Sequence, residues 1–274
     1  MNSIATALTD TKKMEESDYK LNYPESERNL KFEIEKLNDR WKNHLVSMTG
    51  EKSISEIFVS DGFYPYYTNQ KVKVLFIGRE ALEIAGTNYQ EFLYGAYLDN
   101  RIGLQTLNQS KFHSTMLYIA YALENKEYNW LNIPYAEETI HEFARENGFS
   151  FAFMNLSKFS NESGEWKADD ELINKFIELS LKSKENFFGT EIDLLEPDII
   201  IGMNLGGWAE CLGTFSESQD YFGSNDDVRI CNLITQTGKE YLYFDTWHFS
   251  ALGKSPSRDI FYPLLEALKA KRII

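Results

Sequence analysis

Apolar residues are distributed along the chain in two alternating patterns. Short apolar runs that end immediately before a glycine or an asparagine are typical of strands buried on both faces of a parallel sheet. Three such runs cover residues 72–77, 149–154 and 198–203. Two further segments, 228–235 and 240–246, are separated by a Thr237-Gly238 turn and predict a β-hairpin.

Between these strands, apolar residues recur at intervals of three and four, which predicts amphipathic helices. The first covers residues 30–45, and the acidic pair Asp169 and Asp170 opens a later one. Pro263 must either start or kink the C-terminal helix. Two more helical patterns cover residues 111–124 and 136–147.

The alternation of strands and helices predicts a three-layer α/β/α sandwich with a central, mainly parallel sheet. Right-handed crossovers place the carboxyl ends of parallel strands on one edge, and ligands bind in the crevice outside those ends. The residues that follow the predicted strands are therefore the candidates for function. They are Gly78, Arg79, Glu80, Asn155, Asn204, His248 and Ser250.

The chain of 274 residues is long enough for one large domain with a substantial core. Residues 1–28 are polar, which predicts a flexible lead-in, and residues 29–274 are expected to form a single α/β domain. No apolar run approaches the roughly 18 residues of a membrane span, and no secretion signal is evident. The two cysteines, Cys211 and Cys231, are expected to be buried thiols in a reducing cytoplasm.

The net charge of −14 disfavours a protein that binds nucleic acid through its phosphates, because such proteins usually present a basic surface. Residues 248–274 differ from the rest of the chain, with five basic residues against two acidic ones. Those cations either gather on an anion-binding face or complement the dipole at the end of the last helix.

Several of the residues at the predicted edge have side chains suited to a nucleobase. Asn155 can pair with the carbonyl and N–H edge of a pyrimidine, or it can cap the turn after its strand. His248 can donate a hydrogen bond to a developing oxyanion, or it can be packed among aromatic residues. Glu80 either faces the crevice to position water or forms a surface pair with Arg79.

Other motifs are weaker. Asn204 opens an Asn-Leu-Gly-Gly-Trp turn that either presents backbone N–H groups to an anion or packs Trp208. The histidines show no metal-ligand spacing, and no phosphate-binding glycine motif or nucleophile elbow occurs. We therefore expect no metal and no cofactor.

Taken in order, these segments resemble the motifs of the uracil-DNA glycosylase superfamily. Residues 74–81 correspond to its first motif, a strand followed by Gly-x-Asp-Pro or a relative of it. Asn155 corresponds to the asparagine that reads the base, and residues 197–202 resemble the third core strand. His248 begins the segment that corresponds to the last motif, His-Pro-Ser.

The resemblance implies hydrolysis of the N-glycosidic bond of a deaminated or damaged base that is flipped out of DNA. Glu80 would orient water, His248 would stabilise the departing base, and Tyr94 or Phe112 would stack on it. The residues expected to bind substrate are Gly78, Arg79, Asn155, Ser250 and Asn204. Those expected to hold flanking phosphates are Lys254, Ser255 and Arg258.

The chain also departs from the family. Ala81 and Phe249 stand where the family usually has proline, and Glu80 is longer than the residue it replaces. The four cysteines of the iron–sulfur branch are absent, which excludes that cofactor. An alternative function is a non-catalytic module of the same fold that binds a nucleobase, a nucleotide or a protein, and the acidic charge favours it. A small-molecule hydrolase or transferase ranks last, because no nucleophile signature occurs.

Overall fold

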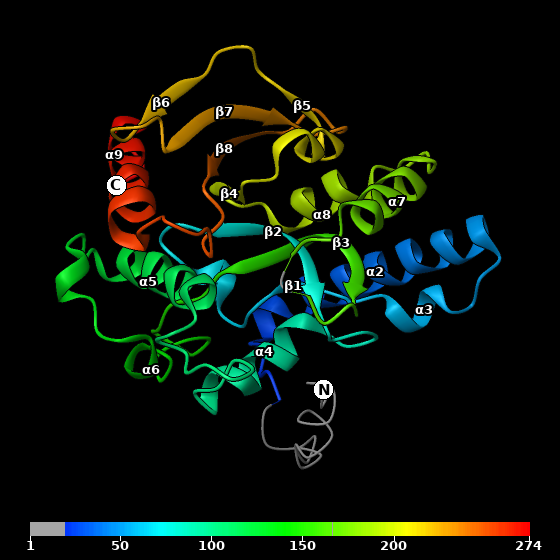
Figure 1. Cartoon of the computed structure of the whole chain (residues 1–274), viewed down its shortest axis with the longest axis horizontal. Helices are drawn as coiled ribbons and strands as arrows, with labels where there is room; N and C mark the ends of the chain where they lie inside the picture. Colours follow the sequence, from blue (N-terminus) through cyan, green and yellow to red (C-terminus); the bar gives the residue numbers. More distant parts are fainter. Residues whose placement is uncertain (1–19, 166) are drawn as a thin grey trace.

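In the computed structural model, which describes residues 20–165 and 167–274, an eight-stranded sheet forms the centre of the protein (Figure 1). The strand order is β1-β3-β2-β4-β8-β7-β5, and β6 pairs with β7. The parallel centre consists of β3 (Ala152–Asn161), β2 (Val74–Leu82), β4 (Ile199–Met203) and β8 (Glu240–Thr246). The antiparallel strands are β1 (Gly62–Phe63), β5 (Thr214–Phe215), β6 (Asp220–Phe222) and β7 (Val228–Ile234). The sheet is therefore mixed, with the predicted parallel strands at its centre.

Helices cover both faces of this sheet. Alternate residues of β2 enter different apolar clusters: Val74 and Phe76 belong to one, and Leu75 and Ile77 to the other. The first cluster includes α4 (Tyr89–Leu98), α5 (Lys111–Asn125) and α9 (Tyr262–Ala270). The second includes α2 (Arg28–Thr49), α3 (Ile54–Ile57), α7 (Asp170–Leu181) and α8 (Phe187–Leu195). The layers are those of an α/β sandwich.

Most of the predicted elements are confirmed. The Asp169 side chain caps α7 by accepting the N–H groups of Glu171 and Leu172, and Pro263 lies in the first turn of α9. The segment 136–147 is an exception, because α6 (Ala136–Thr139) ends after one turn. The left-handed backbone of Ala144 and Asn147 is incompatible with a longer helix.

Two predicted strand ends are wrong. Gly78 and Asn155 lie inside β2 and β3 and do not follow them. The reason is that these two strands continue to pair with each other beyond the end of β4, through Glu80 with Ser157. A glycine or an asparagine does not end a strand whose backbone still has a pairing partner.

The N-terminal segment also differs from the expectation. Residues 1–19 lie outside the described residues, but residues 20–28 pack on the body of the protein. Leu21 is buried in the first apolar cluster. The fully buried Glu27 accepts hydrogen bonds of 2.7 Å from the backbone N–H groups of Tyr66 and Thr68. Residues 20–28 are therefore packed against the domain, in contrast to the flexible lead-in predicted for this part of the chain.

Short helical segments complete the chain. They are η1 (Glu25–Glu27), η2 (Tyr67–Asn69), η3 (Trp130–Asn132), η4 (Gly206–Leu212) and the π-helical η5 (Pro256–Phe261). Cys211 and Cys231 are buried free thiols, as expected. Within the described residues, no helix combines the length and the apolar character needed to cross a bilayer.

Candidate functional site

The register of the parallel strands sets the position of the predicted crevice. Gly78 pairs directly with Asn155, and its neighbour Ile77 pairs with Gly202 near the end of β4. Asn204 follows the last residue of β4, and His248 lies two residues beyond the end of β8. Gly78 and Asn155 therefore lie level with the ends of β4 and β8, although β2 and β3 run on.

Gly78 makes room for the Phe153 side chain of β3. A Cβ atom at this position would lie 2.8 Å from Cζ of Phe153 and 3.7 Å from Oδ1 of Asn155. The Phe153 ring stacks in turn on Tyr89, with 4.4 Å between ring centres and 7° between planes. The absence of a side chain at Gly78 thus gives space to the Phe153 ring, and the Asn155 amide lies beside it over β2.

Asn155 is buried, with 1% of its surface exposed. Its backbone N–H donates a hydrogen bond of 2.6 Å to Oδ2 of Asp61, whereas its side-chain Nδ2 has no partner among the described residues. A buried donor without an acceptor costs about 1–3 kcal/mol. The Asn155 amide therefore has an unused hydrogen-bond donor.

His248 is held in one tautomer by Ser250. The backbone N–H of Ser250 lies 3.3 Å from Nδ1 of His248, and its Oγ lies 2.8 Å from the same atom. A backbone N–H can only donate, so Nδ1 is an acceptor and the ring proton is on Nε2. Burial, together with the charge of Arg79, lowers the pKa of His248 to about 4. His248 is therefore a neutral Nε2–H donor at physiological pH.

Phe112 connects the two parts of the site. Its ring stacks on His248, with 5.3 Å between centres and 24° between planes, and its centre lies 6.1 Å from that of Phe153. Tyr94, the other aromatic candidate, lies beside Phe143 and lines a separate cavity of about 310 Å³. Of the two predicted aromatic residues, Phe112 is the one next to His248.

The titration of His248 is expected to have its midpoint at about pH 4, so the ring should remain neutral between pH 5 and pH 8. The measurement is the pH dependence of the imidazole ¹⁵N chemical shifts by NMR. Arg79→Gln should raise the midpoint, because the Arg79 charge contributes to lowering the pKa of His248. A midpoint of 6 or above in the wild type would contradict the buried neutral ring.

Arg79 connects β2 to the loop after β4. Its guanidinium donates two hydrogen bonds, of 3.1 and 2.7 Å, to the backbone carbonyl oxygen of Asn204 and lies 5.5 Å from the centre of the Trp208 ring. Asn204 itself has left-handed backbone geometry, with φ of 53°. The structure thus brings Arg79, Asn204 and His248 together.

Glu80 points away from this group. Its Oε1 accepts hydrogen bonds from Nδ2 of Asn161 at 2.9 Å and from the backbone N–H of Asp169 at 2.8 Å. Its Oε2 is buried without a partner among the described residues, and burial raises the pKa of the carboxyl. The surface pair with Arg79 is wrong, because Arg79 binds Asn204. Glu80 instead holds the residue that caps α7.

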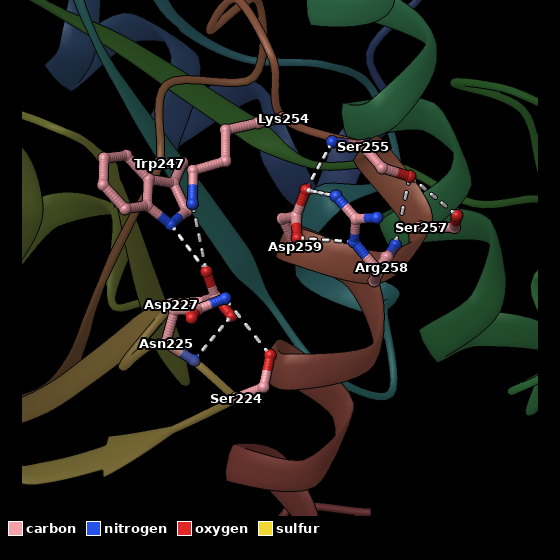
Figure 2. Close-up of polar contacts among 9 residues, drawn as sticks. All are labelled: Ser224, Asn225, Asp227, Trp247, Lys254, Ser255, Ser257, Arg258 and Asp259. Carbon is pink, nitrogen blue, oxygen red and sulfur yellow. Dashed lines mark hydrogen bonds and ion pairs between the residues drawn. The ribbon is translucent and has the colours of Figure 1, made fainter.

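The predicted phosphate-binding residues already have carboxylate partners (Figure 2). Nζ of Lys254 lies 3.3 Å from Asp227 and 3.7 Å from the centre of the Trp247 ring. Arg258 donates two hydrogen bonds of 2.9 Å to Asp259. In the same segment, the backbone N–H of Ser255 donates to Asp259, while its Oγ accepts from the backbone N–H of Arg258. Both cations are therefore neutralised locally.

A buried ionic group that was not predicted from the sequence lies behind Asn155 and consists of Asp61, Lys158 and Glu191. Each is fully buried; Lys158 forms an ion pair with Asp61 and another, of 2.9 Å, with Glu191. Asp61 also accepts the backbone N–H of Asn155, which couples this group to the site. The sequence does contain one indication of this group, which is the charged Lys158 within a strand that is buried along its length.

The electrostatics of this group depend on its burial. Burial raises the pKa of Glu191 to about 8, against the opposing charge of Lys158. Burial alone would lower the pKa of Lys158, but the two carboxylates outweigh it and leave that pKa raised. Glu191 therefore holds a proton in the folded protein at pH values at which a solvated glutamate has lost it.

No group of three or more histidine, cysteine or acidic residues in the described part of the chain has a geometry that could hold a metal ion. The candidate site consists of Asn155, His248, Arg79 and the rings of Phe112 and Phe153.

Comparisons of the chain with protein-family models, with curated proteins and with solved structures find no match.

Proposed function

We propose that the protein is a divergent member of the uracil-DNA glycosylase superfamily, which hydrolyses the N-glycosidic bond of a base flipped into the crevice. The observation that carries the proposal is the state of His248: it is neutral, its proton is on Nε2, and it stacks beside Phe112. The unpaired amide of Asn155 lies at the same edge of the sheet. These groups suit a planar ligand that develops negative charge.

In the proposed reaction the bond between C1′ and the base nitrogen breaks, and the base leaves with the electron pair. A water oxygen bonds to C1′, and a water proton restores the neutral base. Nε2–H of His248 donates to the carbonyl oxygen on which the negative charge grows, and the nearby charge of Arg79 stabilises the same oxygen. Asn155 pairs with the edge of the base. Glu80 takes no part in this scheme, because its carboxylate binds Asn161 and Asp169 away from His248.

A second candidate is a non-catalytic module that binds a nucleobase or a nucleotide. The pairing of Lys254 with Asp227 and of Arg258 with Asp259 favours it, because neutralised cations contribute little to phosphate binding. The net charge of −14 also disfavours phosphate binding and so favours the non-catalytic module. A cytoplasmic location fits both candidates, since Cys211 and Cys231 are free thiols.

Base release from DNA distinguishes the two candidates. Single- and double-stranded oligonucleotides that carry uracil or hypoxanthine are incubated with the protein, and the free base and the abasic sites are quantified. The glycosylase predicts release of at least one of these bases, with stoichiometric abasic sites. A protein that releases no base but binds free nucleobases by calorimetry would support the non-catalytic module instead.

A further inference from the structure

A cavity of about 790 Å³ opens beside β7 and β8, outside the candidate site. It is lined by Gly206 and Gly207 of η4, by Phe215, and by Arg229 and Asp245 on the sheet. Phe215 belongs to the second apolar cluster, whereas Phe153 belongs to the first, so the cavity lies on the opposite face of the sheet. Its volume is within the roughly 300–1,000 Å³ typical of small-molecule pockets.

The ion pair of Arg229 and Asp245, in which one carboxylate oxygen has no hydrogen-bond partner among the described residues, lies on the sheet side of this cavity. Arg229 and Asp245 are directly opposite in the β7–β8 register, and the Arg229 guanidinium donates to Oδ2 of Asp245 at 2.9 Å. The other carboxylate oxygen, Oδ1, is buried and has no partner among the described residues. An arginine has five N–H donors, so Arg229 can make further hydrogen bonds. An unused acceptor thus lies beside a residue with spare donors.

The remaining walls suit a flat, uncharged group. Gly206 and Gly207 have no atom within 4 Å of the position of an added Cβ, so their backbone borders open space. The Phe215 ring lines the same cavity. Because Glu210 and Asp245 outnumber Arg229 among its charged residues, a phosphate group is disfavoured there.

We propose that this cavity binds a free nucleoside through a base edge on which an N–H lies next to a carbonyl. The N–H donates to Oδ1 of Asp245, and Arg229 donates to the carbonyl oxygen. The sugar occupies the remaining volume towards Gly207, and no phosphate is required. This binding is independent of the proposed base release, because it uses the other face of the sheet.

Calorimetry with matched ligands tests the hydrogen-bonding edge. Uridine and inosine are titrated into the full-length protein, alongside 3-methyluridine and 1-methylinosine, in which a methyl group replaces the N–H. The parent nucleosides should bind, and the methylated ones should bind at least about tenfold more weakly, as expected when a buried charged acceptor loses its donor. Equal affinities of parent and methylated nucleosides, or no binding of any of them, would overturn the proposal.

Variants assign the binding to one face of the sheet. Asp245→Asn should weaken uridine binding at least about tenfold, and its thermal unfolding midpoint reports whether it folds. Gly207→Phe provides a second variant: its backbone is outside the left-handed region and its Cβ position is open, so the new ring should enter the cavity and abolish binding.

The double variant Asn155→Ala, His248→Ala separates this inference from the proposed function. It should retain the affinity of the cavity for uridine while losing base release. Loss of uridine binding in the double variant, with retention in Asp245→Asn and Gly207→Phe, would place the nucleoside in the crevice and overturn the second site. That outcome would leave the proposed glycosylase intact.

Discussion

Replacing Lys158 with methionine is expected to lower the free energy of unfolding by about 3–5 kcal/mol, because it leaves the buried Asp61 carboxylate without its cationic partner. Lys158, Asp61 and Glu191 are all fully buried, so water cannot solvate the two acids. Asp61 also accepts the backbone N–H of Asn155, and the loss of its cationic partner should loosen the candidate site.

Urea denaturation followed by circular dichroism measures this effect. Lys182→Met is the matched control, since it breaks an exposed ion pair with Glu178 on α7 and should leave the unfolding midpoint unchanged. If both variants unfold at the same urea concentration as the wild type, the buried group is not the stabilising feature that its geometry indicates.

The same group makes stability depend on pH. Burial raises the pKa of Glu191 from 4.5 to about 8, so between these values the folded protein holds a proton that the unfolded chain releases. This contribution to stability is complete below pH 4.5 and is lost as the pH rises through about 8. The loss should be greater in Lys158→Met, because that variant lacks the charge that stabilises the ionised Glu191.

Local patterns in the sequence predicted the elements that rest on local physics. The apolar periodicity of α2, the capping Asp169 of α7 and the Thr237-Gly238 hairpin depend on neighbouring residues, and each is present. The position of the candidate site follows from the parallel topology, which brings Gly78 and Asn155 level with the ends of β4 and β8.

Features that depend on distant partners were not predictable in the same way. Lys158 is separated by 97 residues from Asp61 and by 33 from Glu191, and no local pattern indicates that these residues meet. Phosphate binding by Lys254 is a similar case, because the carboxylate that pairs with it, Asp227, lies on another segment of the sequence. The length of β2 was underestimated because its continuation depends on pairing with β3.

The Arg229–Asp245 pair is a different case, because its register follows from the predicted hairpin. Residues equidistant from the Thr237 turn pair across β7 and β8, and Arg229 is opposite Asp245. The register does not predict that Oδ1 of Asp245 is buried without a donor, because this depends on how η4 and β5 pack above the sheet.

If the protein is the proposed glycosylase, replacing His248 with alanine is expected to lower the rate of base release by about 10²–10³-fold, the usual effect of removing one donor to a developing oxyanion. The variant lacks the Nε2–H that Ser250 fixes by donating to Nδ1. Leu252→Ala is the matched control, because Leu252 lies on the same loop and is 99% exposed. Single-turnover rates are measured on a DNA substrate from which the wild type releases the base, and they separate the chemical step from binding.

Ser250→Ala provides an intermediate test of the same mechanism. Its backbone N–H remains, so Nδ1 of His248 keeps a donor and Nε2 keeps the proton, although the Oγ contact of 2.8 Å is lost. The rate should therefore fall much less than in His248→Ala. A His248→Ala variant as fast as the wild type would remove the oxyanion role from His248. Base release would then have to be assigned to Arg79, whose charge lies close enough to lower the pKa of the histidine.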